Sequence, residues 1–327
     1  MNFLRQTAIR LGYAIALLLA VVVLNFVLIH IAPGDIADTI AGDMGGATEE
    51  VMAQIRADYG LDKPFLVQLG LYMGNVVQLD FGYSFFFNTP VTSLIAERLP
   101  ATLLLVFSAQ LLALVIGVVL GVISAQRPNG MLSHFVTLLA LFGYSAPVFW
   151  TGIMLLIGLS LMLPLFPVAG MIDARLMDAP MWRQYLDVLH HLFLPALTLA
   201  SIFLALYSRL CRASMLEVLG ADYIRTARAK GLTEREIVYK HALKNSLGPV
   251  VTLAGLQFSA VVSGAVLVET VFSWPGLGTL ALQSILARDT PTILGILFFS
   301  ALVVIVGNLL TDFALRLIDP RIRSGGG

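Results

Sequence analysis

Apolar residues run through this chain in six long stretches, and charged segments separate each stretch from the next. A helix rises about 1.5 Å per residue, so about 20 apolar residues cross the ~30 Å hydrocarbon layer of a membrane. The short alternating segments that a transmembrane barrel requires are not evident. The pattern therefore predicts an all-α integral membrane protein with six transmembrane helices, over 11–31, 101–125, 135–163, 193–216, 250–272 and 292–315.

The composition places the chain in the membrane class. It is 58% hydrophobic and 12% charged, whereas an average soluble domain is about 25% charged. The first run follows Arg5 and Arg10, is about twice as long as the apolar core of a signal peptide, and has no clear cleavage site after it, so we expect it to remain as an anchor. The single Cys211 excludes an internal disulfide.

The connection after the first run, residues 32–100, is far longer than a turn and carries helix signals of its own. Thr48 can cap a helix with two glutamates in its first turn and an apolar residue at every fourth position. A second helical stretch covers 64–78. A third begins at Thr89 and Pro90, a cap followed by the proline favoured at the first helical position. We expect a small helical cap outside the membrane.

The distribution of basic residues predicts the orientation, because Lys and Arg near span ends are retained in the cytoplasm. Most of the 20 basic residues lie in the two terminal segments, in the short second connection and in the fourth connection, which share one side of the membrane. Acidic residues are concentrated on the opposite side. Both termini are therefore expected in the cytoplasm, and the cap region is expected outside it.

The fourth connection, residues 217–249, holds the largest cluster of basic residues and predicts two helices. The first begins at Asp222, a favourable N-cap, and ends before Gly231, which can take the left-handed closing conformation. The second opens with Thr233 and has Glu236 three residues later, which fits a capping box. Basic residues alone would only contact anionic headgroups. The small residues and the paired caps predict instead a rigid elbow that fits against another protein.

This elbow resembles the conserved loop of ATP-binding-cassette importer permeases, whose general pattern is Glu-Ala-Ala, three residues, then Gly. Arg225 and Thr226 depart from that pattern, and Ala227 and Gly231 keep it. The departure is usual in the dipeptide, oligopeptide and nickel branch, and the chain resembles its B-type permease subunit. Further agreement with that branch comes from Ala32–Asp35, Tyr59–Pro64, Asp80–Gly82, Arg98–Pro100 and Val268–Gly278.

The resemblance implies the organisation and the partners of the chain. Residues 1–31 would form the N-terminus and first helix, 32–100 an extracytoplasmic helical region, and 101–327 a five-helix permease core with the coupling loop 217–249. The implied partners are a homologous second permease, two ATP-binding subunits, an extracytoplasmic solute-binding protein and membrane lipid, with no nucleic acid. The ATPase-coupling residues would be Asp222, Tyr223, Arg225, Thr226, Ala227, Arg228, Ala229, Lys230 and Gly231.

The implied function is ATP-driven import through a multi-pass protein of the bacterial inner membrane. The cargo would be peptides or related small solutes, and the sequence does not distinguish dipeptides, oligopeptides, glutathione, opines and nickel chelates. The chain lacks the Gly-Lys pair of a Walker A loop, so ATP hydrolysis is expected in partner subunits. Five scattered histidines and the absence of hydrolase motifs predict no catalytic residue, cofactor or metal site in this chain.

An ion-coupled secondary transporter is the alternative function. Such proteins bind the driving ion with charged groups near the middle of the membrane. The candidate carboxylates, Glu269 and Asp312, lie close to the ends of predicted spans. This placement favours the ATP-driven importer.

Polar and aromatic residues inside the runs indicate where a solute path would lie. In the fifth run, Gln257, Ser259 and Ser263 recur at intervals that can share a helix face, and we predict Gln257 and Ser263 as path residues. The same residue types also make packing contacts between membrane helices, so both interpretations stay open. The third run carries Tyr144, Ser145, Pro147, Trp150 and Thr151.

Two residues at the outer end of the fifth run form a possible outer gate. Trp274 is most simply an anchor at headgroup depth, and the resemblance makes a gate or a seat for a solute-binding protein the alternative. Glu269 is most simply an outer-end residue that pairs with a neighbouring loop.

Overall fold

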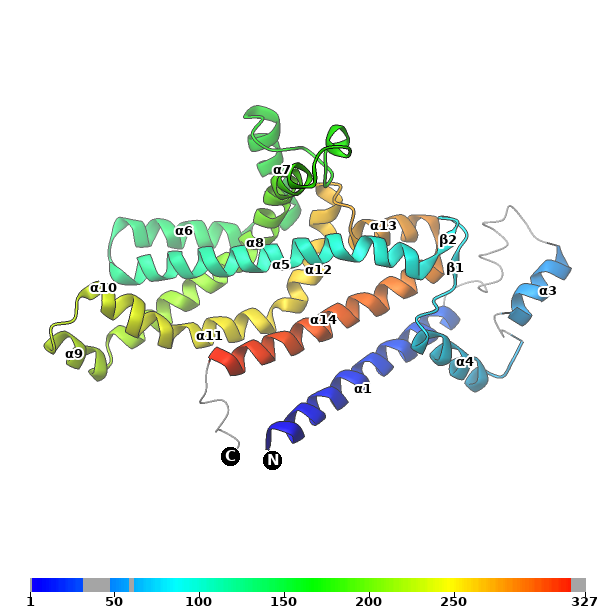
Figure 1. Cartoon of the computed structure of the whole chain (residues 1–327), viewed down its shortest axis with the longest axis horizontal. Coiled ribbons are helices and arrows are strands. Elements are labelled where there is room, and N and C mark those ends of the chain that lie inside the picture. The colour runs from blue at the N-terminus through cyan, green and yellow to red at the C-terminus, as the bar shows by residue number, and fades with distance from the viewer. Residues whose placement is uncertain (1, 32–47, 59–61, 319–327) are drawn as a thin grey trace. The chain divides into compact units, whose positions relative to one another are not determined.

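The computed structural model describes residues 2–31, 48–58 and 62–318, and within these ranges the chain is almost entirely helical (Figure 1). A short hairpin pairs β1 (Tyr83–Ser84) with β2 (Thr89–Pro90) in antiparallel register. Ala32–Asp35 and part of the Tyr59–Pro64 motif lie outside the described residues.

The helices have the following bounds. They are α1 (Asn2–Ile31), α3 (Glu49–Asp58), α4 (Phe65–Val77), α5 (Val91–Gln126), α6 (Met131–Ser145), α7 (Val148–Leu156), α8 (Met181–Leu219), α9 (Asp222–Ala229), α10 (Glu234–Glu236), α11 (Leu243–Leu256), α12 (Phe258–Val271), α13 (Leu277–Ala287) and α14 (Thr290–Ile318). A π-helical segment, Ile157–Met162, continues α7, and a second one, Ile237–Ala242, joins α10 to α11. Ala174–Leu176 form a 3₁₀ turn.

Four helices of the described residues are long and apolar enough to cross a membrane: Ala8–Leu28, Val91–Gln126, Met181–Leu219 and Thr290–Thr311. A fifth candidate is the pair Glu234–Leu256 and Phe258–Val271, which is bent by 55°. The third predicted run is not one continuous helix, because α6 ends at Ser145 and α7 begins at Val148. Pro147 explains the break, since proline lacks the amide donor and disfavours helical geometry at the residue before it.

The helix signals in residues 32–100 are confirmed in full in two of three cases. Thr48 Oγ1 lies 3.5 Å from the amide nitrogen of Val51 at the start of α3, and α4 covers the second predicted stretch. The third signal is followed by a helix, but the helix begins at Val91 and the roles predicted for Thr89 and Pro90 were wrong. Thr89 and Pro90 form β2, and the helix that follows is the beginning of α5, which continues through Pro100 to the membrane run.

The chain divides into two compact units. The first comprises residues 1–100 and 276–305, with a buried core that includes Phe81, Ile95 and Leu280. A polar cluster ties the hairpin of this unit to the start of α14. Asp289, only 2% exposed, accepts hydrogen bonds from the hydroxyl groups of Ser84 at 2.5 Å and Thr292 at 2.6 Å.

The second unit comprises residues 101–275 and 306–327, and α8 packs against α6, α7, α11 and α12 within it. Helices α5 and α8 approach closely through glycine. A Cβ atom added at Gly117 would lie 2.9 Å from the Cβ of Tyr207, and one added at Gly121 would lie 2.6 Å from the Cβ of Cys211. Small residues allow such backbone approach between membrane helices.

Candidate functional site

The elbow of residues 217–249 is two helices joined by a left-handed glycine. Helix α9 ends with Gly231 at φ +80°, a conformation that glycine adopts at little cost. Helix α10 opens with the predicted capping box: the amide of Glu236 donates to Thr233 Oγ1 at 3.3 Å, and the amide of Thr233 donates to Glu236 Oε2 at 3.1 Å. Both predicted turn signals are confirmed.

One detail of this prediction was wrong by a position. Helix α9 begins at Asp222 itself, and Ala221 occupies the N-cap. The carboxylate of Asp222 therefore lies in the first turn, where it complements the positive end of the helix dipole. The second helix of the elbow extends well beyond α10, because the π segment Ile237–Ala242 joins α10 directly to α11.

An ion pair closes the elbow across the glycine. Arg228 Nε donates to Glu234 Oε1 at 2.8 Å, and this bond holds the pKa of the Glu234 carboxyl below its usual range. The hydrogen bonds from Thr233 likewise lower the pKa of Glu236. Both carboxyl groups therefore stay ionised at neutral pH, and the two arms are joined by charge as well as by backbone.

The elbow has one buried side and one exposed side. Ile224 and Ile237 have no exposed surface, and the π segment Ile237–Ala242 packs against α8, α9 and α11; Figure 1 shows α9 and α10 close together. Of the predicted coupling residues, Ala227 is half-buried and the others are exposed: Asp222, Tyr223, Arg225, Thr226, Arg228, Ala229, Lys230 and Gly231. The elbow thus presents most of its predicted contact residues outward on a fixed base.

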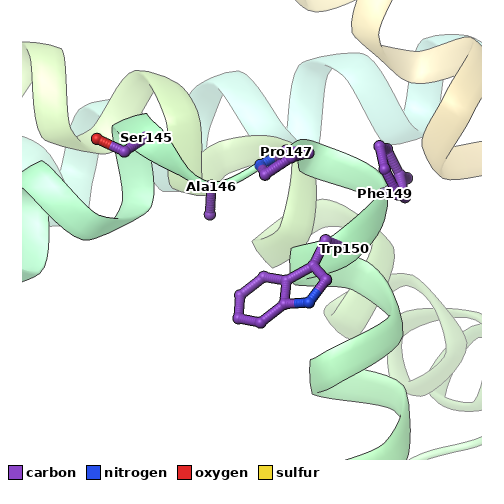
Figure 2. Close-up of a pocket in the computed structure, with 5 residues that line it drawn as sticks. All are labelled: Ser145, Ala146, Pro147, Phe149 and Trp150. Carbon is purple, nitrogen blue, oxygen red and sulfur yellow. The ribbon is translucent and has the colours of Figure 1, made fainter.

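The break between α6 and α7 lies beside a pocket of ≈ 340 Å³. Ser145, Ala146, Pro147, Phe149 and Trp150 line this pocket (Figure 2). Figure 2 shows the side chains of Ala146 and Trp150 on the same open side of the break. The helical hydrogen bonds of α7 begin at Thr151, whose amide donates to the carbonyl of Pro147 at 3.0 Å.

The predicted path residue Gln257 occupies the bend between α11 and α12. A bend of this size ends the helical series of backbone hydrogen bonds, so carbonyls in the last turn of α11 lose their helical donors. One of these carbonyls, that of Ala254, accepts a 3.1 Å hydrogen bond from Gln110 Nε2. The same amide nitrogen lies 3.2 Å from the hydroxyl of the fully buried Tyr207.

The α14 helix packs on both sides of this bend. A Cβ atom built on Gly307 would lie 1.9 Å from the Phe258 ring, and one built on Gly255 would lie 2.1 Å from the Thr311 methyl group. Gln257 is the C-cap of α11 and also the N-cap of α12, where its carbonyl accepts a hydrogen bond from the amide of Val261 at 3.1 Å. Ser263 is exposed, and its hydroxyl donates to the carbonyl of Ser259 at 3.1 Å.

The C-terminal end of α12 forms a buried polar network with the first third of α5. Glu269 has no exposed surface and accepts a 2.6 Å hydrogen bond from Thr102 Oγ1. Its backbone carbonyl accepts from the amide of Trp274 at 2.8 Å, and the Trp274 indole donates to the Ala101 carbonyl at 2.8 Å. Trp274 is 0% exposed, so its interpretation as a headgroup anchor was wrong. One described partner of the Glu269 carboxylate is therefore Thr102 on α5.

Sequence reasoning missed the residues that hold these features in place. Gln110 and Thr102 occur inside an apolar run, where nothing local distinguishes them from packing residues. Pro147 was visible as a break signal in the third run. The side chain of Asp312 is outside the described residues, and among the residues that were described, no three His, Cys, Asp or Glu side chains group closely enough to hold a metal ion.

Two protein families match the chain. Residues 117–324 match the inner membrane component of binding-protein-dependent transport systems, and residues 2–106 match the N-terminal part of such membrane components. Among curated proteins, the dipeptide transport system permease protein DppB of Escherichia coli (strain K12) is 39% identical over 330 residues, which cover 96% of this chain and 97% of that protein.

The fold is also similar to a solved transporter. An inward-facing structure of the MetNI methionine ABC transporter superposes with a TM-score of 0.54 at 18% identity, covering 69% of this chain and 96% of the other. A second crystal form of the same transporter gives a TM-score of 0.55. At this identity the likeness shows the fold alone.

Proposed function

This chain belongs to the family of inner-membrane components of binding-protein-dependent transport systems, and we propose that peptides or related small solutes are its cargo. It is a permease subunit of an ATP-binding-cassette importer, and ATP hydrolysis belongs to the ATP-binding subunits with which it works. The peptide cargo is inferred from the similarity to a dipeptide permease. The relatives give no support to the ion-coupled alternative.

The elbow is the proposed contact with the ATP-binding subunits. Its exposed face on a buried base, closed by the Arg228–Glu234 pair, supports this role. Closure of two ATP-binding subunits around ATP would carry the elbows together and rock the helices between inward and outward openings. A rigid elbow is required for this step, because a flexible one would absorb the movement. The capping box and the left-handed Gly231 supply that rigidity.

The proposed topology has six crossings, with the broken α6–α7 segment counted as one of them. The region 32–100 would then form an extracytoplasmic cap, 101–327 the permease core, and both termini would be cytoplasmic. The proposed complex adds a homologous second permease, two ATP-binding subunits and an extracytoplasmic solute-binding protein. Most basic residues fall on the proposed inner side, which supports the orientation.

Gln257 and Ser263 are the proposed path residues, and Glu269 and Trp274 the proposed outer gate. Gln257 lies at the bend of a broken helix, and broken helices line solute sites in membrane transporters. The network of Glu269 and Trp274 with α5 joins two helices at one end of α12. A joint of this kind would open or close when α12 moves relative to α5.

A co-purification experiment tests the coupling role. The wild-type chain and the variants Gly231→Val and Gly231→Asn would be purified from detergent-solubilised membranes, and the associated subunits identified. A β-branched valine is strained at φ +80°, whereas asparagine tolerates the left-handed region. We expect ATP-binding subunits and a second permease with the wild type, a roughly tenfold loss of ATP-binding subunits with Val, and near-normal recovery with Asn. A chain that purifies alone in all three cases would refute the proposed complex.

A further inference from the structure

The connection between α7 and α8 is long for a segment with little regular structure. Residues 163–180 follow the π segment Ile157–Met162 and contain only the short 3₁₀ turn Ala174–Leu176. Connections longer than about 12–15 residues without secondary structure are uncommon in compact domains, and most of them are functional or disordered. This connection, which we call the strap, is held in place by hydrogen bonds along its length.

Side chains on the first turns of α8 hold both ends of the strap. Gln184 Nε2 donates to the carbonyl oxygens of Met177 at 2.8 Å and Ala179 at 2.9 Å. His190 Nε2 donates to the carbonyl oxygen of Leu165 at 2.8 Å. The strap therefore lies along the beginning of α8.

Asp187 on α8 fixes the middle of the strap. Its carboxylate accepts a hydrogen bond from the backbone amide of Asp173 at 2.7 Å. The same carboxylate oxygen lies 3.4 Å from Nδ1 of His191, and both side chains are largely buried. A buried carboxylate is costly unless donors surround it, so these contacts favour one position of the strap over others.

The strap also reaches the C-terminal end of α12. The amide of Gly170 donates to the carbonyl of Phe272, the C-cap of α12, at 2.9 Å. Gly170 has φ +87°, a conformation that costs glycine little. Helix α7 packs against the same two helices, since a Cβ atom built on Gly152 would lie 3.2 Å from both the Phe272 ring and the Thr198 methyl group. The strap and α7 together join the end of α12 to α8.

The elbow joins the same helices a second time. Helix α8 is continuous from the strap to Leu219, just before α9, whereas the route from α10 through α11 to α12 contains the 55° bend at Gln257. The two routes thus form a frame that is closed by the elbow at one end and by the strap at the other. Residues at the ends of helices absorb backbone rotation most readily, so a change in the shape of this frame is expected at Gln257.

We propose that the strap is a positioning segment of the transport cycle, which keeps the beginning of α8 and the end of α12 together while the bend at Gln257 takes up the displacement of the elbow. The proposal rests on the proposed coupling role of the elbow and adds the residues that would transmit its movement to the far ends of these helices. Gln184 and Asp187 act through the strap backbone, and Gly170 supplies the bond to α12.

Electron spin distance measurements on the complete importer in lipid nanodiscs test the strap. One nitroxide pair is attached through Tyr185→Cys and Thr270→Cys, at exposed positions near the strap, and a second pair through Lys244→Cys and Thr270→Cys, on either side of the bend. Native Cys211 is buried. Between the nucleotide-free and the ATP–vanadate state, we expect the first distance to change by less than about 2 Å, as between packed helices, and the second by more than about 2 Å.

Variants of the strap supply the second readout. Gly170→Val is strained at φ +87°, whereas Gly170→Asn tolerates this region and keeps the amide donor. Gln184→Glu keeps the size of the side chain and loses both donated bonds. With Val or Glu, we expect the distance between positions 185 and 270 to change with nucleotide by more than about 2 Å, and with Asn to stay as in the wild type. Met177→Ala is the matched control, because its exposed side chain changes and its carbonyl remains.

The outcomes separate the strap from the proposed function. A wild-type importer that recovers its ATP-binding subunits, and so upholds the proposed coupling, would overturn the strap alone in either of two cases. The first is a change in the distance between positions 185 and 270 as large as the change across the bend. The second is wild-type behaviour of both Gly170→Val and Gln184→Glu. A wild-type chain that recovers no ATP-binding subunits would refute the proposed coupling, and the role of the strap in the cycle with it.

Discussion

The side-chain amide of Gln110 on α5 donates a hydrogen bond to the backbone carbonyl of Ala254, just before the 55° bend at Gln257. Its second contact is the buried Tyr207 hydroxyl. We therefore expect Gln110→Leu to lower the free energy of unfolding by roughly 1–2 kcal/mol, because two buried polar groups lose their partner. Thermal unfolding in detergent measures the effect.

The matched control for this change is Gln126→Leu. Gln126 lies on the same helix but is exposed, so its replacement should change the stability by less than about 0.5 kcal/mol. Gln110→Glu separates the two contacts, since a carboxylate can accept from Tyr207 but cannot donate to Ala254. Equal stability of Gln110→Leu and the wild type would show that the bend does not depend on this amide.

The double substitution Gln257→Leu with Ser263→Leu tests the proposed path. If both side chains line the path, solute uptake by the assembled importer should fall roughly tenfold, because apolar replacements remove polar contacts with the cargo. Uptake into proteoliposomes and recovery of the partner subunits would be measured on the same preparation. Normal uptake by a normally assembled variant would assign both residues to helix packing.

Trp274 should contribute strongly to stability. Trp274→Ala removes a fully buried side chain, and we expect a loss of about 3–5 kcal/mol. Trp274→Phe keeps most of the volume and loses the bond to Ala101, so its cost should be about 1 kcal/mol. Thermal melts would be compared with Trp182→Ala, whose exposed ring predicts a small change. If Trp274→Ala and Trp182→Ala had the same melting temperature, the side chain of Trp274 would lie on an accessible surface.

Two glycines in the second unit should respond to alanine with opposite signs. A methyl group at Gly121 would meet Cys211 Cβ at 2.6 Å and the Ser208 carbonyl at 2.8 Å, so Gly121→Ala should cost about 1–3 kcal/mol through overpacking. Gly158, in the π segment after α7, has nothing within 4 Å of a Cβ built on it, and Gly158→Ala should be neutral or stabilising by up to ~1 kcal/mol. Unfolding midpoints of the two variants measure the difference. Similar midpoints would contradict the close approach of α5 and α8.

Local features of this fold could be predicted from the sequence. Two examples are the capping box of Thr233 and Glu236 and the left-handed Gly231. Each depends only on residues within one or two helical turns, so a short stretch of sequence is enough to predict it. The lengths of the apolar runs depend only on membrane thickness. The same reasoning failed at Thr89 and Pro90, where the hairpin pairing with Tyr83 and Ser84 outweighed a helix-start signal.

Features that depend on distant contacts could not be predicted. Trp274 follows an apolar run, as an interfacial tryptophan would, and its burial follows from a bond to Ala101 on another helix. Residues 276–305 belong to the first compact unit although they follow the fifth run in sequence. The bend at Gln257 has no proline or glycine at the break itself, and the carbonyl of Ala254 before it accepts a hydrogen bond from Gln110 on α5.

The rigid elbow also affects the free energy with which a partner subunit would associate with the permease. The second arm begins with a capping box and an ion pair joins it to the first, so a subunit that docks at this proposed contact would not have to order a disordered loop. The entropic penalty of association is correspondingly smaller. An interface of this kind can be weak and specific at once, and its subunits can dissociate and rebind without any refolding of the permease.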